Sequence, residues 1–227
     1  YARSYSPTIN QAKVEKALQT NVYPYSPPVV ASRDGKAYAF WVYDDPARSS
    51  LDRTKLVYSE LIEGTWGIPR AVWDDSTADV SPQAAVLPDG RVLVVWENIN
   101  SHLPDNAQLE DLLPKMDIAY GLYDPAQRTW QAGNLTGDAY FDHSPKLSAA
   151  PDGKALLTWT KNKANSLFGS SAAPDTLAYA LWNGSWSAPQ EIRTDAKPVI
   201  KSNLAYDGAK GYLVWESDED GDISTLV

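Results

Sequence analysis

Cysteine is absent from this chain of 227 residues, methionine occurs once and histidine only twice. Without cysteine there is no disulfide, no thiolate zinc site and no thiol nucleophile. The two histidines, His102 and His143, have no histidine or cysteine partner at the spacing of metal ligands. The sequence therefore argues against zinc and against cysteine chemistry, whereas it leaves the redox compartment open.

Long apolar runs and basic blocks are also missing. The apolar stretches are as short as Val92–Trp96, far below the roughly 20 residues that a membrane span requires. The formal net charge is −9 and the 20 basic residues are scattered, so the dense basic footprint of a nucleic-acid-binding protein is lacking. We expect no membrane span and no nucleic-acid partner. Residues 1–10 contain neither an initiating methionine nor a signal peptide, so we expect the chain to begin inside a longer precursor.

An internal repeat is the most informative feature that is present. Asp-Gly pairs begin at Asp34, Asp89, Asp152 and Asp207, which are 55, 63 and 55 residues apart. Each pair is followed by an apolar run that ends in tryptophan, at Trp41, Trp96, Trp159 and Trp215. Each is preceded by a run that opens with Ser-Pro or a variant, at Ser26, Ser81, Ser144 and Ser202. The regular recurrence of the tryptophans favours packing between repeats over a sugar-stacking role.

Each copy reads as four antiparallel strands, which we call A to D in chain order. The Asp-Gly pair is a hairpin turn between strands A and B, because glycine tolerates positive φ and aspartate bonds its own backbone. Strand C ends in Tyr58, Tyr120 and Tyr179 in the first three copies, and strand D opens at Trp66, Trp130 and Trp186. Four strands per repeat of about 50 residues is the blade of a β-propeller. We expect an all-β, single-domain fold with blades over residues 26–76, 81–136, 144–194 and 202–227.

Both chain ends fall inside a repeat. The fourth copy stops in strand C, and residues 11–21 lie where strand D lies in the other copies. The composition of Asn10–Gln19 alone favours a helix, but the repeat register predicts an outer strand that pairs with a strand C. Three complete blades and a partial fourth fit either a four-bladed ring closed by its first and last strands or a fragment of a larger propeller.

The motifs resemble blades of bacterial secreted and surface propellers. Ser187–Gln190 after Trp186 is similar to sialidase-like (BNR-type) repeats, and Leu135-Thr136 followed by Ser144-Pro145 is similar to TolB-type repeats. The resemblance implies a secreted or cell-surface propeller. The motifs specify the architecture well and the activity poorly. The Asp-box turns of sialidases and an arginine triad on strands A are missing, so the resemblance does not carry sialidase activity over to this chain.

Two functions from different classes fit these observations. The first is a non-catalytic extracellular or cell-surface scaffold that binds a protein or a carbohydrate. The alternative is a glycan-acting hydrolase, sialidase-like or another glycosidase, because Glu97 and Glu216 stand at equivalent positions in two blades and paired carboxylates perform glycoside hydrolysis. A purely structural blade array is a third possibility. No catalytic residue is assigned.

The candidate ligand-binding residues gather on one predicted rim. The B–C loops at 44–53, 98–116 and 161–174 share that rim with the D–A connections, and long loops on a rigid scaffold usually carry function. The candidates are Asp44, Asp45, Asp79, Glu97, Asn98, Asp142, His143 and Glu216. We expect any protein or carbohydrate partner to bind at this rim. We expect the opposite rim, formed by the A–B hairpins, to take no part in binding.

Calcium is the one cofactor that the sequence offers. Asp218, Asp220 and Asp222 alternate along the chain, and their carboxylates could converge on one Ca²⁺, which takes six to eight oxygen ligands. However, Ile223 stands where the calcium-loop pattern requires glycine. A solvated hairpin loop is therefore the alternative interpretation of this acidic run.

Overall fold

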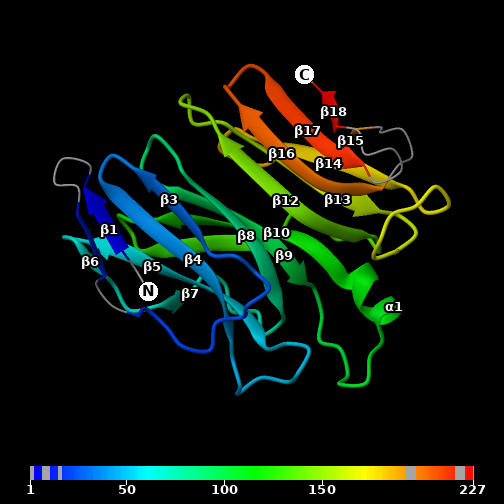
Figure 1. Cartoon of the computed structure of the whole chain (residues 1–227), viewed down its shortest axis with the longest axis horizontal. Coiled ribbons are helices and arrows are strands. Elements are labelled where there is room, and N and C mark those ends of the chain that lie inside the picture. The colour runs from blue at the N-terminus through cyan, green and yellow to red at the C-terminus, as the bar shows by residue number, and fades with distance from the viewer. Residues whose placement is uncertain (1–2, 7–10, 15–16, 193–197, 218–222, 227) are drawn as a thin grey trace.

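The structure, a computed structural model, describes residues 3–6, 11–14, 17–192, 198–217 and 223–226. It contains four antiparallel sheets and a separate hairpin (Figure 1). In each sheet the strands are neighbours in chain order, which is the meander that the repeat predicts. The all-β propeller architecture is therefore confirmed, with three complete blades and a fourth that has strands A, B and C.

The strand bounds follow the predicted repeat closely. Blade 1 consists of β3 (Val29–Arg33), β4 (Lys36–Asp44), β5 (Thr54–Ile62), β6 (Thr65–Trp66) and β7 (Arg70–Ala71), and the last two both pair with β5. Blade 2 consists of β8 (Asp79–Val86), β9 (Val92–Ile99), β10 (Met116–Asp124) and β11 (Thr129–Asn134). Blade 3 consists of β12 (Phe141–Ala149), β13 (Ala155–Asn162), β14 (Asp175–Trp182) and β15 (Gln190–Ile192). Blade 4 consists of β16 (Val199–Tyr206), β17 (Gly211–Ser217) and β18 (Ile223–Leu226). One short helical segment, α1 (Leu109–Leu112) and η1 (Leu113–Lys115), lies in the B–C loop of blade 2.

The Asp-Gly pairs are the A–B turns, as predicted. Gly35, Gly90, Gly153 and Gly208 all have positive φ, between 79° and 102°. A side chain at such a residue would be strained, whereas glycine has no Cβ to clash. The turn chemistry therefore fixes where each strand A ends and strand B begins.

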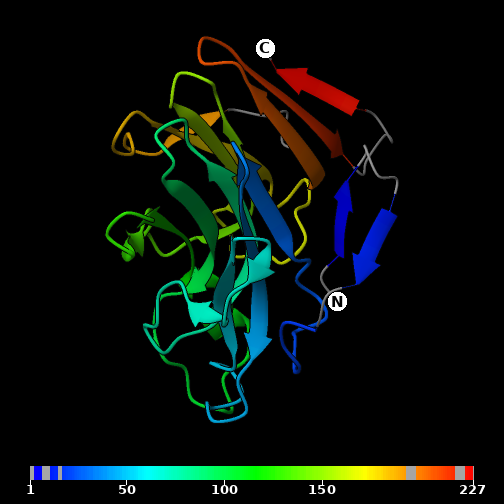
Figure 2. The same cartoon turned by 90° about the vertical axis from the view of Figure 1, so that its left-hand side faces the viewer.

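The blades pack face to face through their innermost strands. β3 contacts β8, β8 contacts β12, and β12 contacts β16 (Figures 1 and 2). Every residue of β9 and of β13 is buried, because a neighbouring blade covers each face of these strands. The core thus lies between blades, where Trp96 and Trp159 are fully buried.

The amino-terminal segment departs from the prediction. Gln11–Val14 form a strand, β2, but it pairs with β1 (Arg3–Ser6) and not with a strand C. A local hairpin closes a much shorter loop than pairing across the molecule, so it costs less chain entropy. Further along, the backbone of Asn21 and Tyr23 bonds the end of β4. Among the described residues β18 pairs only with β17, so the ring closure by first and last strands is not formed.

No helix among the described residues is long and apolar enough to cross a membrane.

Candidate functional site

The B–C loops and D–A connections of blades 1 and 2 meet on one rim, as expected. His102 Nδ1 lies 2.8 Å from Asp52 Oδ2, which joins the B–C loops of the two blades. Arg48 donates to the carbonyl of Thr77 at 2.9 Å and also bonds Asp74, so the first B–C loop holds the D–A connection. These contacts fix the rim, and they occupy polar groups that a ligand would otherwise use.

Asp79, the first residue of β8, joins blades 1 and 2 by hydrogen bonds. Its Oδ2 accepts the N–H of Leu56 at 3.0 Å, and its Oδ1 accepts the indole N–H of Trp96 at 2.6 Å and the amide of Asn98 at 3.1 Å. Burial raises the pKa of Asp79 to about 7, although these donors oppose the shift. Asp79 and Asn98 are both fully buried, so they join the blades and do not face a ligand.

Asp142, the second residue of β12, pairs two residues after the strand-B tryptophan as Asp79 does in β8, but its bonding differs. Its Oδ1 accepts the indole N–H of Trp159 at 2.8 Å, as Asp79 does from Trp96. Leu56 directly precedes Val57, which pairs with Trp41, and Ile118 directly precedes Ala119, which pairs with Trp96. The backbone N–H of Ile118 therefore corresponds to that of Leu56. Thr136 Oγ1 accepts this N–H at 2.9 Å. Asp142 Oδ2 consequently has no hydrogen-bond partner in the described part of the chain.

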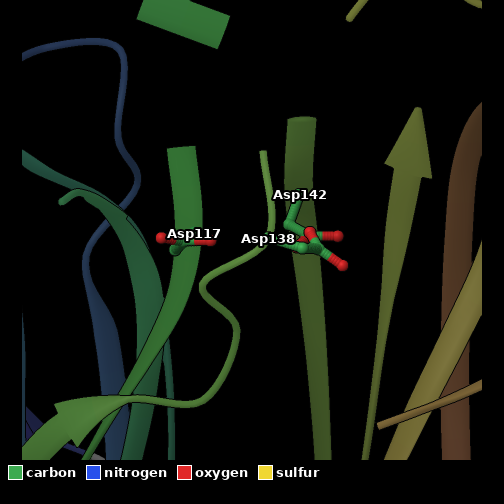
Figure 3. A group of neighbouring side chains, drawn as sticks. All are labelled: Asp117, Asp138 and Asp142. Carbon is green, nitrogen blue, oxygen red and sulfur yellow. The ribbon is translucent and has the colours of Figure 1, made fainter. Parts of the chain in front are cut away.

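Two further carboxylates lie beside Asp142. One oxygen each of Asp117, Asp138 and Asp142 lies within 4.8 Å of the others (Figure 3). The buried ammonium of Lys161 lies 2.5 Å from Asp138 Oδ2 and 3.8 Å from Asp142 Oδ1. Burial raises the pKa of Asp142 to about 7 and that of Asp117 above its usual range. Sequence reasoning singled out only Asp142 of this cluster.

The side chain of His143 points away from that of Asp142, because successive side chains of a strand point to opposite faces. Its ring stacks on Phe141 with centroids 4.2 Å apart, and its Nδ1 lies 3.0 Å from Ser144 Oγ. Burial lowers the pKa of His143 to about 4. The imidazole is therefore neutral at pH 7 and serves the packing of β12.

Inner strands β8 and β12 each contain a bulge at the Ser-Pro motif. Ser81 and Ser144 both have φ of +57°, and the pairing register shifts at each. A bulge bends the strand and leaves a backbone group without its ladder partner. Ser26 Oγ accepts the N–H of Ser81 at 2.9 Å, and Glu97 Oε1 accepts the N–H of Ser144 at 2.8 Å. In both cases the preceding blade caps the bulge.

Glu97 and Glu216 have different environments despite their equivalent positions. Glu97 is buried, which raises its pKa, while the Ser144 N–H, the Ser81 hydroxyl and the Lys146 ammonium counter this. Glu216 is exposed on β17. Glu97 is therefore committed to holding the bulge of blade 3 in place.

A cavity of about 330 Å³ opens between inner strands β12 and β16. It is lined by Ser144, Lys146, Thr160, Val199, Ile200, Lys201 and Ser202. The lining of this one concave site thus includes two lysines and three hydroxyl-bearing residues. Sequence reasoning missed Lys146 and Lys201, because the direction of a side chain on strand A depends on the bulge. A second, largely apolar groove of about 360 Å³ lies near the A–B hairpin of blade 4 and includes Leu156, Tyr179, Tyr206 and Leu213.

The remaining predicted site residues have local contacts or cannot be placed. Asp44 bonds Arg53 at 2.7 and 3.1 Å, and Asp45 Oδ1 accepts the N–H of Ala47 at 3.0 Å. Both acids stabilise their own loop. Asp218, Asp220 and Asp222 lie outside the described residues, so the calcium interpretation of that run stays a prediction.

Comparison with known proteins supports the fold. No family model and no curated protein matches the chain. Among solved structures, a Hadza microbial sialidase matches with a TM-score of 0.61 and 11% identity over 88% of this chain and 43% of its own. The GH93 α-L-arabinofuranosidase of Fusarium graminearum, in complex with arabinobiose, matches with a TM-score of 0.58 and 12% identity over 95% of this chain and 66% of its own. A PL25 ulvan lyase, bound to -[GlcA(1-4)Rha3S]-, matches with a TM-score of 0.59 and 14% identity over 96% of this chain and 54% of its own.

These matches define a class of fold. The chain is a β-propeller assembly of the kind found in sialidase-like and other glycan-acting proteins, as its repeat motifs indicated. Identities of 11–14% show the fold alone. The chain spans between 43% and 66% of the length of these structures.

Proposed function

We propose that this chain belongs to a glycan-acting β-propeller and that it binds an anionic carbohydrate in the cavity between β12 and β16. The observation that carries the proposal is that Lys146, Lys201 and three hydroxyl-bearing residues line this cavity of about 330 Å³. Ligand sites of this size are concave and hold a few convergent polar groups. Hydroxyls bond sugar hydroxyls, and ammonium groups bond a carboxylate or a sulfate.

The fold comparison favours this glycan-acting function over the non-catalytic scaffold. The matched structures are described as a sialidase, an arabinofuranosidase and an ulvan lyase. Their ligands and activities belong to those proteins, and they enter here only as support for carbohydrate as the ligand class. Such a ligand implies a secreted or cell-surface location, where polysaccharides are met. Catalytic groups are not assigned to this chain.

The direct test is the affinity for a panel of neutral and acidic oligosaccharides, measured by calorimetry. We expect the acidic sugars to bind and Lys146→Ala and Lys201→Ala each to weaken binding about 10-fold or more, because a hydrogen bond to a charged group contributes roughly 1.5–3 kcal/mol. The matched control is Lys163→Ala, since Lys163 belongs to the same blade but is exposed and bonds Glu191 at 2.8 Å.

Release of shorter products from a bound polysaccharide would distinguish a glycan-cleaving protein from a binding scaffold. The proposed site is wrong if both cavity variants bind as well as the wild-type protein, or if Lys163→Ala weakens binding to the same extent.

A further inference from the structure

We propose that Asp117, Asp138 and Asp142 form a binding site for a divalent cation, Ca²⁺, between blades 2 and 3. This site is separate from the proposed sugar cavity and does not depend on it. The three carboxylates come from three different segments: the start of β10, the D–A connection after β11, and the start of β12. An ion bound there would join strand C of one blade to strand A of the next.

The geometry of the oxygens fits calcium. One oxygen from each carboxylate lies within 4.8 Å of the other two, and Figure 3 shows Asp138 and Asp142 next to each other with Asp117 on the adjacent strand. Calcium–oxygen distances are about 2.3–2.6 Å, so two oxygens on opposite sides of one ion are separated by about 5 Å. Asp138 is exposed, which gives the ion a route from solvent and room for water ligands.

A buried oxygen without a donor points independently to a ligand. Asp142 is 0% exposed, and its Oδ2 has no hydrogen-bond partner within the described residues. Burying a carboxylate oxygen without a partner is costly, and native proteins almost always satisfy such atoms. A cation bound among the three carboxylates supplies the partner that this oxygen lacks.

The charge of the cluster matches a divalent ion. When all three carboxylates are ionised, as metal binding requires, they carry three negative charges, and Lys161, which contacts Asp138 and Asp142, carries one positive charge. The difference is two negative charges, which one divalent cation neutralises. Carboxylate oxygens are hard ligands that prefer Ca²⁺, Mg²⁺ or Mn²⁺ to softer metals. Calcium tolerates irregular geometry, whereas Mg²⁺ requires a near-ideal octahedron.

The junction between blades 1 and 2 shows what the same position looks like without an ion site. There, both oxygens of Asp79 accept protein hydrogen bonds, and two basic residues, Arg48 and Lys55, contact Asp74. Protein donors thus occupy both oxygens of Asp79 at this junction. The comparison within one molecule supplies a matched control, because Asp74 and Asp138 are exposed aspartates in equivalent D–A connections.

The test is thermal unfolding of the full chain in EDTA and in excess Ca²⁺. We expect Ca²⁺ to raise the Tm of the wild-type protein by about 4 °C or more, as binding to the folded state alone predicts. Asp138→Asn and Asp117→Asn should lose this rise, whereas Asp74→Asn should keep it. Because Asp138 is exposed, its variant is expected to fold even if the buried Asp117 variant does not.

Terbium luminescence provides a second measurement that is independent of stability. The indole nitrogen of Trp159 lies 2.8 Å from Asp142 Oδ1, so Tb³⁺ in the site should emit when tryptophan is excited, and Ca²⁺ should displace it. We expect Asp138→Asn to lose this emission. No calcium effect on the wild-type Tm, or an equal effect in Asp138→Asn and Asp74→Asn, would overturn the proposal.

Discussion

At the scale of single residues, the strand-B tryptophan of each of the first three blades is a hydrogen-bond donor as well as a packing group. Trp96 and Trp159 donate to Asp79 and Asp142, and Trp41 donates to Gln19 Oε1 at 2.9 Å. The repeat therefore preserves an indole donor, while its acceptor changes from blade to blade. This agrees with the expectation that these tryptophans pack between repeats.

Trp96→Phe tests this role. We expect a loss of about 2–4 kcal/mol in the free energy of unfolding, because a buried cavity forms and the Asp79 carboxylate loses one of its donors. Urea unfolding monitored by far-UV circular dichroism measures it. Trp66→Phe is the control, since Trp66 lies only half-buried on the two-residue strand β6, and it should cost clearly less. Equal losses of unfolding free energy in the two variants would contradict a special role for the bond between Trp96 and Asp79.

The buried carboxyl of Asp79 should also make stability depend on pH. Its pKa is about 7 in the folded protein and 3.8 for the ordinary carboxyl, and burial is the main cause. Between these values the folded state binds more protons than the unfolded state, so stabilisation present below about pH 4 is lost as pH rises toward 7. The slope from one group is at most about 1.4 kcal/mol per pH unit.

Asp79→Asn removes this titration. The variant loses stability relative to the wild-type protein, and we expect the gap between them to be largest near pH 4.5 and to narrow toward pH 8. Urea unfolding at pH 4.5, 6 and 8 measures the gap. A gap that is constant or widens with pH would show that Asp79 is ionised throughout.

At the scale of elements, the bulged inner strands decide which side chains reach the cavity. Ser144 and Lys146 lie at and just after the bulge of β12, so the cavity depends on the cap that Glu97 provides. The corresponding cap in blade 2 comes from the hydroxyl of Ser26. A neutral acceptor is therefore sufficient to hold such a bulge.

Three variants separate the bulge from the sugar site. Glu97→Gln keeps an acceptor for the Ser144 N–H, so we expect near-normal stability and sugar affinity. Glu97→Ala leaves this N–H unsatisfied, which should cost about 1–3 kcal/mol of stability and weaken sugar binding. Ser26→Ala should lose stability but keep binding, because it affects only the bulge of β8. Chemical denaturation and calorimetry provide the two measurements, and normal binding by Glu97→Ala would show that the bulge does not shape the cavity.

At the scale of the whole molecule, the charge near the cavity differs from the net charge of the chain, and the burial of strand B differs between blades. The chain carries a net charge of −9, yet the cavity presents two lysines. Screening at physiological ionic strength acts over about 8 Å, so a ligand there meets the two lysines and the buried Glu97 that bonds Ser144, and the distant acids contribute little. Blade 4 is also less covered than its neighbours, since Tyr212 and Val214 of β17 are about 40% exposed, whereas β9 and β13 are buried throughout.

The blade could be predicted from the chain, because strand period, Asp-Gly turns and strand-B tryptophans are local signals that recur with the repeat. The sites could not, because they depend on contacts between blades. Asp79 and Asp142 have the same place in the repeat, yet both oxygens of Asp79 accept hydrogen bonds, whereas Asp142 Oδ2 has no partner among the described residues and Thr136 accepts the N–H of Ile118. Lys146 faces the cavity because a bulge changes which face the following side chains take. Such contacts join residues from different blades, and neither spacing nor composition specifies them.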